Sequence, residues 1–440
     1  MRDEAVCHLQ SLVRINTTNP PGNEIAAAQY LGDVLRAEGY EPLILEAAPT
    51  RGNLIARWKG DGSLPPLLLF GHTDVVPAEP EHWTHLPFAG DFHGGFVWGR
   101  GTLDMKSMVV MEMMTMLLLA RQNVSLKRDV IFAATADEEY EGKYGLGWLV
   151  QEHPDLIRAE WGLSEFGGYS VTIGHRRVYP IQAAEKGVCW FKLKAVGTPG
   201  HGAMPHDDNA VTKLACAVAR TARTRLPLHV TPTAVRYVRG LAQVVGGWHG
   251  LVLRALLNPR AHALALKWLA GRHPDQARTL AAMLRNTATP TQISGGTAPN
   301  IIPTQAEAIV DGRLLPGIDE RSFLAELRPT LGPGIEMQVF EYGGPLETPV
   351  DTPLFEAMTG GLRRHDPDAV VLPYMLSGAT DAKFAAKLGI KCYGFSPLKL
   401  EAGQPFGELI HGHDERVPVS ALGFGVQVLY EVVRDFCSKG

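Results

Sequence analysis

Short apolar runs alternate with helical patterns along the first part of the chain. Residues 67–70 and 130–134 are continuous apolar runs, which are typical of strands buried on both faces of a sheet. Residues 105–121, between these runs, are rich in Met and Leu and predict a helix that packs into the core. Because parallel strands need such a crossover helix, the pattern predicts an α/β fold with a mostly parallel sheet.

The pattern changes at residue 187. Residues 188–196 alternate apolar and polar side chains like a half-exposed strand. The next expected elements are a helix, two strands, a helix and a strand, at residues 209–225, 291–294, 306–313, 320–331 and 335–342. This βαββαβ order predicts a small two-layer α+β domain inserted into the first domain.

The sequence therefore predicts a discontinuous domain, residues 1–186 and 344–440, and an inserted domain, residues 187–343. Within the inserted domain, residues 235–285 are rich in Ala, Leu and Arg and predict additional helices. From residue 344 the alternation of helices and apolar strands returns, which places the end of the chain in the first domain.

Composition and charge limit the classes of protein that the pattern allows. The chain has 440 residues, which is too many for one ordinary core and agrees with two domains. The formal net charge of −4 gives no electrostatic reason to expect nucleic acid or an anionic membrane as a partner. No run of about 18 uncharged apolar residues suggests a membrane span.

The five cysteines lie far apart and show no Cys-x-x-Cys spacing. Reduced thiols in a cytoplasm explain such a set better than a disulfide framework or a thiolate metal site. The amino terminus enters an amphipathic helical pattern directly and lacks the apolar core of a signal peptide. We therefore expect a cytoplasmic protein in which any metal ligands are histidines and carboxylates.

Metal-competent side chains follow three of the predicted strands. His72 and Asp74 follow the first apolar run. Glu138 and Glu139 follow the second run, and Glu165 follows a third, shorter strand. Because the carboxyl ends of parallel strands share one edge of a sheet, we expect these side chains to lie close together.

Asp104 and His411 complete the set of candidate ligands. Mixed imidazole and carboxylate ligands suit divalent ions, and two ions about 3.5–4 Å apart can share a bridging carboxylate. Such a pair polarises a carbonyl group, and Glu138 is then a free carboxylate that can move the proton of a water. Each residue also has a plainer interpretation: Asp104 as a helix N-cap, adjacent Glu138 and Glu139 as an acidic patch, and His411 with His413 as a surface turn.

Five motifs occur in one order along the chain: Gly-His72-Thr-Asp74, Gly-Arg-Gly-Thr-Leu-Asp104, Asp-Glu138-Glu139, Ser-Glu165 and His411-x-x-x-Glu415. This set resembles the two-zinc exopeptidase and amidohydrolase family, which includes glutamate carboxypeptidase, aminoacylase, acetylornithine deacetylase and succinyl-diaminopimelate desuccinylase. With its long segment at residues 235–285, the chain is most similar to the vacuolar carboxypeptidase-like branch.

The resemblance implies two zinc ions per chain, with cobalt or manganese as alternatives. The implied ligands are His72 and Glu165 at one ion, Glu139 and His411 at the other, and Asp104 at both. The resemblance also implies that Glu138 is the general acid and base, that Asp74 supports His72, and that the peptide after Asp104 is cis.

The inserted domain carries further matches. His201, in a loop rich in Gly and Pro, is similar to a lid histidine that enters the active site of the partner subunit, which implies a homodimer through this domain. Asn300 and Arg313 resemble residues that hold substrate, and an arginine is suited to bind a terminal carboxylate through two hydrogen bonds. Gly378 lies in a loop that offers backbone donors. The plainer interpretations are an exposed loop histidine and a surface ion pair.

These features predict a metal-dependent hydrolase that cleaves an amide bond next to a free carboxylate, in small peptides or N-acyl amino acids. The alternatives are a deacylase rather than a peptidase, or an inactive, metal-stabilised protein that binds amino acids. Serine hydrolases, P-loop proteins and His-Glu-x-x-His proteases have no support, because their motifs are absent from the sequence.

Overall fold

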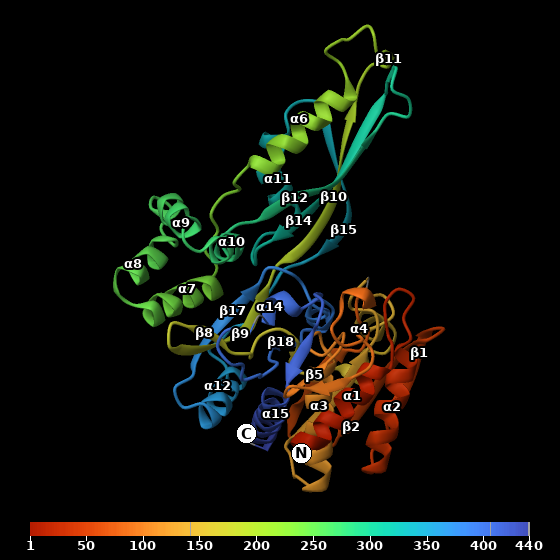
Figure 1. Cartoon of the computed structure of the whole chain (residues 1–440), viewed down its shortest axis with the longest axis vertical. Helices are drawn as coiled ribbons and strands as arrows, with labels where there is room; N and C mark the ends of the chain where they lie inside the picture. The colour runs from red at the N-terminus through yellow and green to blue at the C-terminus, as the bar shows by residue number, and fades with distance from the viewer. Residues whose placement is uncertain (141, 405, 439–440) are drawn as a thin grey trace. The chain divides into compact units, whose positions relative to one another are not determined.

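A computed structural model describes residues 1–140, 142–404 and 406–438. The chain divides into two compact units. Unit 1 comprises Met1–Ala183, Thr348–Tyr374 and Thr380–Gly440, and unit 2 comprises Ala184–Glu347 and Met375–Ala379. Figure 1 shows the elements of both units, and each unit is described by itself below.

Unit 1 contains a large twisted sheet with a parallel centre. Its strands lie in the order β1 (Leu43–Ala48), β2 (Arg51–Trp58), β6 (Arg128–Thr135), β3 (Leu64–His72), β7 (Trp161–Ser164), β18 (Lys391–Gly394) and β9 (Arg176–Glu185). Strands β6, β3, β7 and β18 run parallel to one another, whereas β1, β2 and β9 are antiparallel to their neighbours. Two further strands, β8 (Val171–Ile173) and β17 (Val370–Leu376), pair with β9. The expected α/β fold with a largely parallel central sheet is confirmed.

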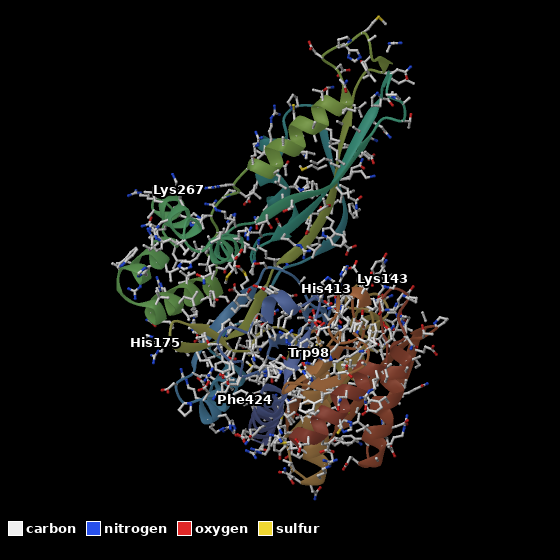
Figure 2. All side chains as sticks on the ribbon, viewed as in Figure 1. Trp98, Lys143, His175, Lys267, His413 and Phe424 are labelled. Atoms are coloured by element: carbon white, nitrogen blue, oxygen red, sulfur yellow. The ribbon has the colours of Figure 1, made fainter. Side chains whose placement is uncertain are left out.

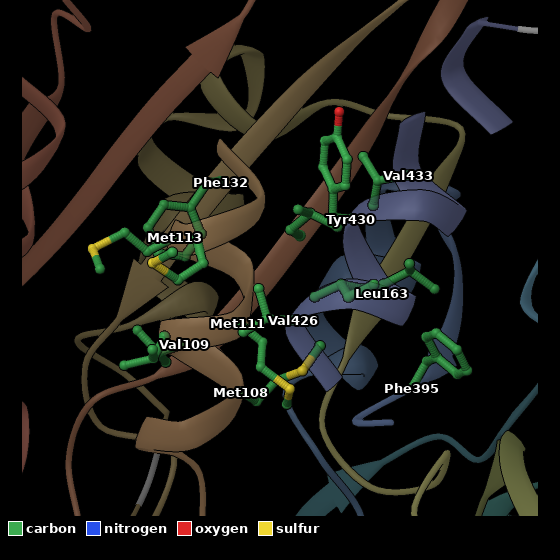
Figure 3. Packing of buried hydrophobic residues seen from close by; sticks show 14 of the residues in the cluster. Met108, Val109, Met111, Met113, Phe132, Leu163, Phe395, Val426, Tyr430 and Val433 are labelled. Atoms are coloured by element: carbon green, nitrogen blue, oxygen red, sulfur yellow. The ribbon is translucent and has the colours of Figure 1, made fainter. Parts of the chain in front are cut away.

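Helices of unit 1 bury the sheet. The longer ones are α1 (Arg2–Arg14), α2 (Glu24–Ala37), α3 (Lys106–Arg121), α12 (Pro353–His365) and α15 (Val419–Ser438), and the short ones are α4 (Leu146–Glu152), α5 (Pro154–Ile157), α13 (Ala382–Ala385) and α14 (Phe406–Leu409). Helix α3 packs between α15, α1 and strand β3. Figure 3 shows Met108 and Met111 of α3 beside Val426 of α15 in this core. Since α3 is buried on nearly all sides, its sequence has no polar face.

A small sheet of three short strands also belongs to unit 1. Its strands are β4 (Asp91–His93), β5 (Phe96–Trp98) and β19 (Arg416–Pro418), and β5 lies in the middle. The pairing of β5 with β19 brings the segment before Asp104 to the segment after His411.

Unit 2 contains the predicted βαββαβ domain. Its antiparallel sheet has the order β12 (Thr287–Gly295), β14 (Gln305–Leu314), β10 (Gly187–Val196) and β15 (Ile335–Gly343). Helices α6 (Ala210–Arg223) and α11 (Glu320–Leu331) pack on this sheet through buried residues that include Phe191, Leu214 and Phe323. The short strands β11 (Gly200–His201) and β13 (Ile301–Ile302) pair with each other, and β16 (Leu346–Glu347) pairs with the end of β9.

Four more helices of unit 2 lie between α6 and β12 in the sequence. They are α7 (Pro232–Val245), α8 (Gly247–Ala255), α9 (His262–Ala270) and α10 (Pro274–Met283). They pack on one another, α7 on α8, α8 on α9 and α9 on α10. Figure 1 shows them as a cluster beside the strands of unit 2, with α8 and α9 on the side away from those strands.

Candidate metal centre

Three adjacent parallel strands end at the same edge of the sheet in unit 1. Strand β3 ends at His72, which lies in register with Thr135 at the end of β6. Glu138 and Glu139 follow β6 directly, and Glu165 follows the last residue of β7. The sheet therefore brings together the polar side chains that follow these three strands, at the edge where such sheets bind ligands.

The two carboxylate oxygens of Asp104 face two different histidines. Oδ1 lies 3.1 Å from Nε2 of His72, and Oδ2 lies 3.1 Å from Nε2 of His411. The same nitrogen of His72 lies 3.5 Å from Oε2 of Glu165, and that of His411 lies 3.1 Å from Oε2 of Glu139. Asp104 thus stands between two groups, each made of one histidine and one glutamate.

His411, rather than the nearby His413, takes part in this arrangement. The ring of His413 packs beside that of His82, and its Nε2 lies 3.9 Å from Glu79. Asp104 does not cap helix α3, because the residue before the first turn is Met105 and that cap has no side-chain hydrogen bond. The peptide bond between Asp104 and Met105 is cis.

Asp74 organises the turn that carries Glu138 and Glu139. Its carboxylate accepts hydrogen bonds from the backbone N–H groups of both glutamates, at 3.1 Å each, and from the side chain of Asn19. Its Oδ1 lies 3.4 Å from Nδ1 of His72, so Asp74 stands behind the ring whose Nε2 faces Asp104. Burial opposes ionisation of Asp74, but His72 first, and then the hydrogen bonds from Asn19 and the backbone of Glu139, outweigh it and hold its pKa below the usual value.

Glu138 and Glu139 lie in a turn that follows strand β6. Asp137 before them has a φ of 66°, a left-handed conformation that is uncommon for a residue with a side chain. The turn still separates the two carboxylates. An oxygen of Glu138 groups with His72 and Glu165, whereas one of Glu139 groups with His72 and Asp104.

Two further residues of the centre have left-handed backbone. Phe166, directly after Glu165, has a φ of 56°, and His411 itself has a φ of 60°. Each such position costs roughly 1–3 kcal/mol and is commonly found where a protein holds a functional side chain in place.

The centre concentrates carboxylates in a buried environment. Burial raises the pKa of Glu138 and of Glu139, and raises that of Glu165 to about 8. Hydrogen bonds that His411 donates to the carboxylates of Asp104 and Glu139 raise its pKa to about 10. Burial opposes protonation of His72, but Glu165 and Asp104 outweigh it and raise its pKa too. The carboxylates therefore compete for the few nearby positive charges, a situation that bound cations relieve.

The donor set fits divalent metal ions. It consists of two imidazole nitrogens and carboxylate oxygens, which together suit ions such as Zn²⁺, Co²⁺ or Mn²⁺. Oε1 of Glu139 is buried and has no hydrogen-bond partner among the described residues. A buried carboxylate oxygen without a donor needs a positive partner, and a metal ion meets that need. The fold and this centre define the class of metal-dependent hydrolases.

Comparison with known families places the chain within this class. Residues 68–435 match the model of peptidase family M20/M25/M40, so the chain belongs to that family. It is 27% identical to a probable carboxypeptidase S-like 2 of Dictyostelium discoideum, over 87% of this chain and 74% of that protein. It is 26% identical to aminoacylase-1B of Rattus norvegicus, over 99% of this chain and 95% of that protein. The expected family and the expected hydrolytic metalloenzyme are confirmed.

Solved structures have the same fold. A metallo-carboxypeptidase of the M20 family from Sulfolobus solfataricus superposes with a TM-score of 0.71 at 17% identity, covering 98% of this chain and 99% of that one. A dinuclear metal-binding peptidase of the same family from Bacillus subtilis gives a TM-score of 0.62 at 14% identity, covering 99% and 98%.

A pocket adjoins Asp104 and Glu165. Its lining includes the apolar side chains of Met108, Phe166, Tyr169, Phe406 and Ile410. The rings of Tyr169 and Phe406 stack with their centroids 4.3 Å apart. The centre therefore has an apolar wall on the side of the pocket.

Two buried charged residues close to the centre, Arg51 and Asp381, were not among the residues predicted from the sequence. Arg51 is buried and forms ion pairs with Glu24 at 2.8 Å and with Asp137 at 2.9 Å. Asp381 is also buried, its two carboxylate oxygens have no hydrogen-bond partner among the described residues, and burial raises its pKa to about 7. No local pattern distinguishes these residues from surface charges, so only their burial identifies them.

The remaining predicted residues belong to unit 2. His201 lies in β11, is exposed, and pairs with Ile301 of β13. Asn300 is close to it, because the backbone carbonyl of Asn300 accepts from Gly202. Arg313 lies in β14 and forms an ion pair with Asp311 at 2.8 Å, and Gly378 lies in the loop after β17. Their roles toward substrate stay predictions.

Proposed function

We propose that this chain is a two-zinc hydrolase that cleaves an amide bond next to a free carboxylate, in small peptides or N-acyl amino acids. The observation that carries the proposal is the position of Asp104, whose two oxygens face His72 and His411 separately. A carboxylate placed in this way is suited to bridge two ions.

The five candidate ligands divide between two positions. His72 and Glu165 would hold one ion, Glu139 and His411 would hold the other, and Asp104 would contact both. Bound ions of this kind polarise a substrate carbonyl and bring the pKa of a water close to neutral. Asp74 fixes the orientation of His72 from behind, which is how carboxylates commonly support metal-binding histidines.

Glu138 is the proposed general acid and base. The backbone N–H of Glu138 donates to Asp74, and an oxygen of its side chain groups with His72 and Glu165. Burial raises its pKa, so its carboxylate holds a proton more readily than a solvated glutamate. It accepts the proton of the attacking water and gives it to the leaving amine.

Unit 2 is the proposed lid and dimerisation domain. There, His201 would stabilise the oxyanion in the partner subunit, and Asn300, Arg313 and Gly378 would bind the substrate.

The five free cysteines support a cytoplasmic location. Among the described residues, no helix is long and apolar enough to cross a membrane.

Metal analysis combined with an amine-release assay tests the proposal. The protein is purified without chelator and assayed on dipeptides and on N-acyl amino acids. We expect about two metal ions per chain, loss of activity with chelator and recovery with zinc. The better substrate class separates a peptidase from a deacylase. Metal binding without turnover on any of these substrates would favour a binding protein, and the absence of metal would exclude the ligand assignment.

A further inference from the structure

The helical part of unit 2 has a charge very different from that of the whole chain. Residues 220–285 contain eleven arginines and lysines but one acidic residue, Asp275, which gives a formal charge of +10 in a chain of net charge −4. The basic residues are Arg220, Arg223, Arg225, Arg236, Arg239, Arg254, Arg260, Lys267, Arg272, Arg278 and Arg285. The net charge of the chain therefore conceals a strongly basic region.

The same region exposes a continuous apolar face on α8 and α9. Trp248 and Leu251, one turn apart on α8, are 54% and 64% exposed, and Leu264 of α9 is 75% exposed. Trp268, one turn after Leu264, joins the two helices, because its ring packs against that of Trp248 with the centroids 4.9 Å apart. We call these four side chains the α8–α9 face. Large apolar side chains exposed together in this way commonly mark an interaction surface.

A basic residue lies beside each part of the α8–α9 face. Arg254 follows Leu251 by three positions, and Lys267 follows Leu264 by three, so each base neighbours an exposed apolar side chain on its helix. The guanidinium of Arg272 lies 4.4 Å from the ring centroid of Trp268. Figure 2 shows Lys267 at the outer side of α9. Charge and apolar surface are thus interleaved and not separated.

A groove next to the α8–α9 face also combines apolar and basic side chains. It is lined mainly by alanines and leucines of α9 and α10, and by the basic side chains of Arg225, Lys267, Arg278 and Arg285. An apolar floor with basic side chains around it suits a molecule that has a hydrocarbon part and an anionic group.

We propose that the α8–α9 face docks onto an anionic phospholipid surface. Trp248, Leu251 and Leu264 enter the interfacial layer of the lipid, where tryptophan and leucine side chains are favoured. The surrounding arginines and lysines contact the phosphate groups, and their attraction adds to that of the apolar side chains. This interaction goes beyond the hydrolysis proposed above and does not depend on it.

Charge complementarity selects lipid over a second copy of the chain. A second copy that met this face with its own α8–α9 face would bring the same positive charge to the contact, and like charges placed together oppose association. A lipid surface offers negative phosphate groups above a hydrocarbon layer, which matches both the bases and the apolar side chains.

Vesicle co-sedimentation of the full chain tests the proposal. Vesicles of phosphatidylcholine are compared with vesicles in which a third of the lipid is phosphatidylglycerol. We expect binding to the anionic vesicles that is about tenfold stronger than to neutral ones and that weakens as salt rises. The variants W248S/L264S and R254Q/K267Q should each weaken binding to anionic vesicles about tenfold. The control variant L86S removes a similarly exposed leucine, 63% exposed, in unit 1 and should bind like the unchanged protein.

Two further measurements make the result decisive. Melting temperature and the hydrolysis rate on a small soluble substrate should be unchanged in all three variants, which shows that they fold. If W248S/L264S fails to fold, R254Q/K267Q carries the test alone. Absent binding to anionic vesicles at low salt, or equal binding by R254Q/K267Q and the unchanged protein, overturns the proposal. The proposal is also overturned if the protein binds no vesicles and W248S/L264S dissociates an oligomer. That result would identify the α8–α9 face as a contact between copies of the chain.

Discussion

Arg100 and Glu415, 315 positions apart in the sequence, form a buried ion pair in which Nη1 lies 2.8 Å from Oε2. The carboxylate of Glu415 also accepts hydrogen bonds from three backbone N–H groups of residues 101–104. Nη2 of Arg100 donates to the backbone carbonyl of His411 at 3.3 Å. The pair therefore joins the segment of Asp104 to that of His411, although neither Arg100 nor Glu415 is a candidate ligand.

Replacing Glu415 by Ala tests this positioning role. The variant leaves Arg100 buried without its partner, so we expect the free energy of unfolding to fall by about 3–5 kcal/mol. We also expect metal affinity to fall roughly ten- to a hundredfold, because Asp104 and His411 lose their common support. Urea unfolding and metal titration measure the two effects.

A surface ion pair provides the control for Glu415. Asp435 pairs with the half-exposed Arg364 at 2.7 Å, so Asp435→Ala should change stability by no more than about 1 kcal/mol and leave metal affinity unchanged. If Glu415→Ala kept the stability and the metal affinity of the wild type, the buried pair would not position the ligands.

Glu138 and Glu139 are adjacent, both donate their backbone N–H groups to Asp74, and yet should respond differently to substitution. Glu138→Gln removes the proton carrier, so kcat should fall by about 10²–10⁴ while the metal content stays the same. Glu139→Gln weakens a ligand, so the metal content itself should fall. Kinetics and metal analysis of the same preparations measure both. Glu79→Gln, at an exposed position, is the control. If Glu138→Gln lost metal and Glu139→Gln lost activity with its metal content unchanged, the two assigned roles would be reversed.

Removing the metal should destabilise unit 1. Without cations, Asp104, Glu139 and Glu165 pair with two histidines among the described residues, His72 and His411. Chelation should lower the melting temperature, and metal added back at a hundred times its Kd should restore about 2.7 kcal/mol of stability. Calorimetry with zinc, cobalt and manganese measures the effect and ranks the ions. Asp104→Asn is the matched variant and should respond much less. Identical melting with and without chelator would contradict cation binding at this centre.

The ligand candidates that the structure brings together follow simple local signals in the sequence. His72 and Glu165 follow short apolar runs, and those runs form adjacent parallel strands. The position of His411 is different, since it depends on the pairing of β5 with β19 and on Arg100. These are contacts over more than 300 positions, and no local pattern reveals them. His411 was selected only by its spacing to Glu415.

Other features could not be predicted, because they depend on burial in the fold or are averaged out in the net charge of the chain. Strand β9 is almost fully buried but contains Pro180, Gln182 and Glu185, so it did not look like a core strand. The basic character of residues 220–285 disappears in the net charge of −4, which had suggested no affinity for anionic membranes. In the sequence, Asp381 is an ordinary aspartate at the start of a predicted helix, whereas the fold buries its side chain.

Lys186 should make the stability of unit 2 depend on pH. Its ammonium group is buried and donates to the carbonyl of Arg285 at 2.7 Å, and burial together with the nearby Arg313 lowers its pKa to about 7. In the unfolded chain the pKa of a lysine is about 10.4, so between pH 7 and 10 the unfolded state binds more protons than the folded state. The free energy of unfolding should therefore rise with pH, by at most about 1.4 kcal/mol per pH unit from this group.

The variant Lys186→Met should have a flatter pH dependence, and urea unfolding between pH 7 and pH 9 measures it. Lys106 also has a pKa lowered to about 7 by burial, but it is present in both proteins and cancels in the comparison. Lys192→Met, which removes a partly exposed lysine paired with Glu307, should keep the wild-type slope. Parallel slopes for Lys186→Met and the wild type would show that Lys186 is charged in the folded state.

His201 is prepared to donate a hydrogen bond. Its Nδ1 lies 3.1 Å from the backbone N of Ala203 and accepts that hydrogen bond, so in the neutral ring Nε2 carries the proton. The ring is exposed at the end of the β11–β13 pair, and its Nε2 can stabilise an oxyanion.

If His201 acts in the partner subunit, two inactive variants should complement each other. His201→Ala and Glu138→Gln are mixed after each has been shown to be nearly inactive. A hybrid dimer has one complete site, formed by His201 of one chain and Glu138 of the other, so random exchange should restore about a quarter of the wild-type activity. Native mass spectrometry measures how far the subunits of the two variants exchange. His201→Ala alone, treated in the same way, is the control. Proven exchange without recovered activity would mean that His201 does not act across the dimer.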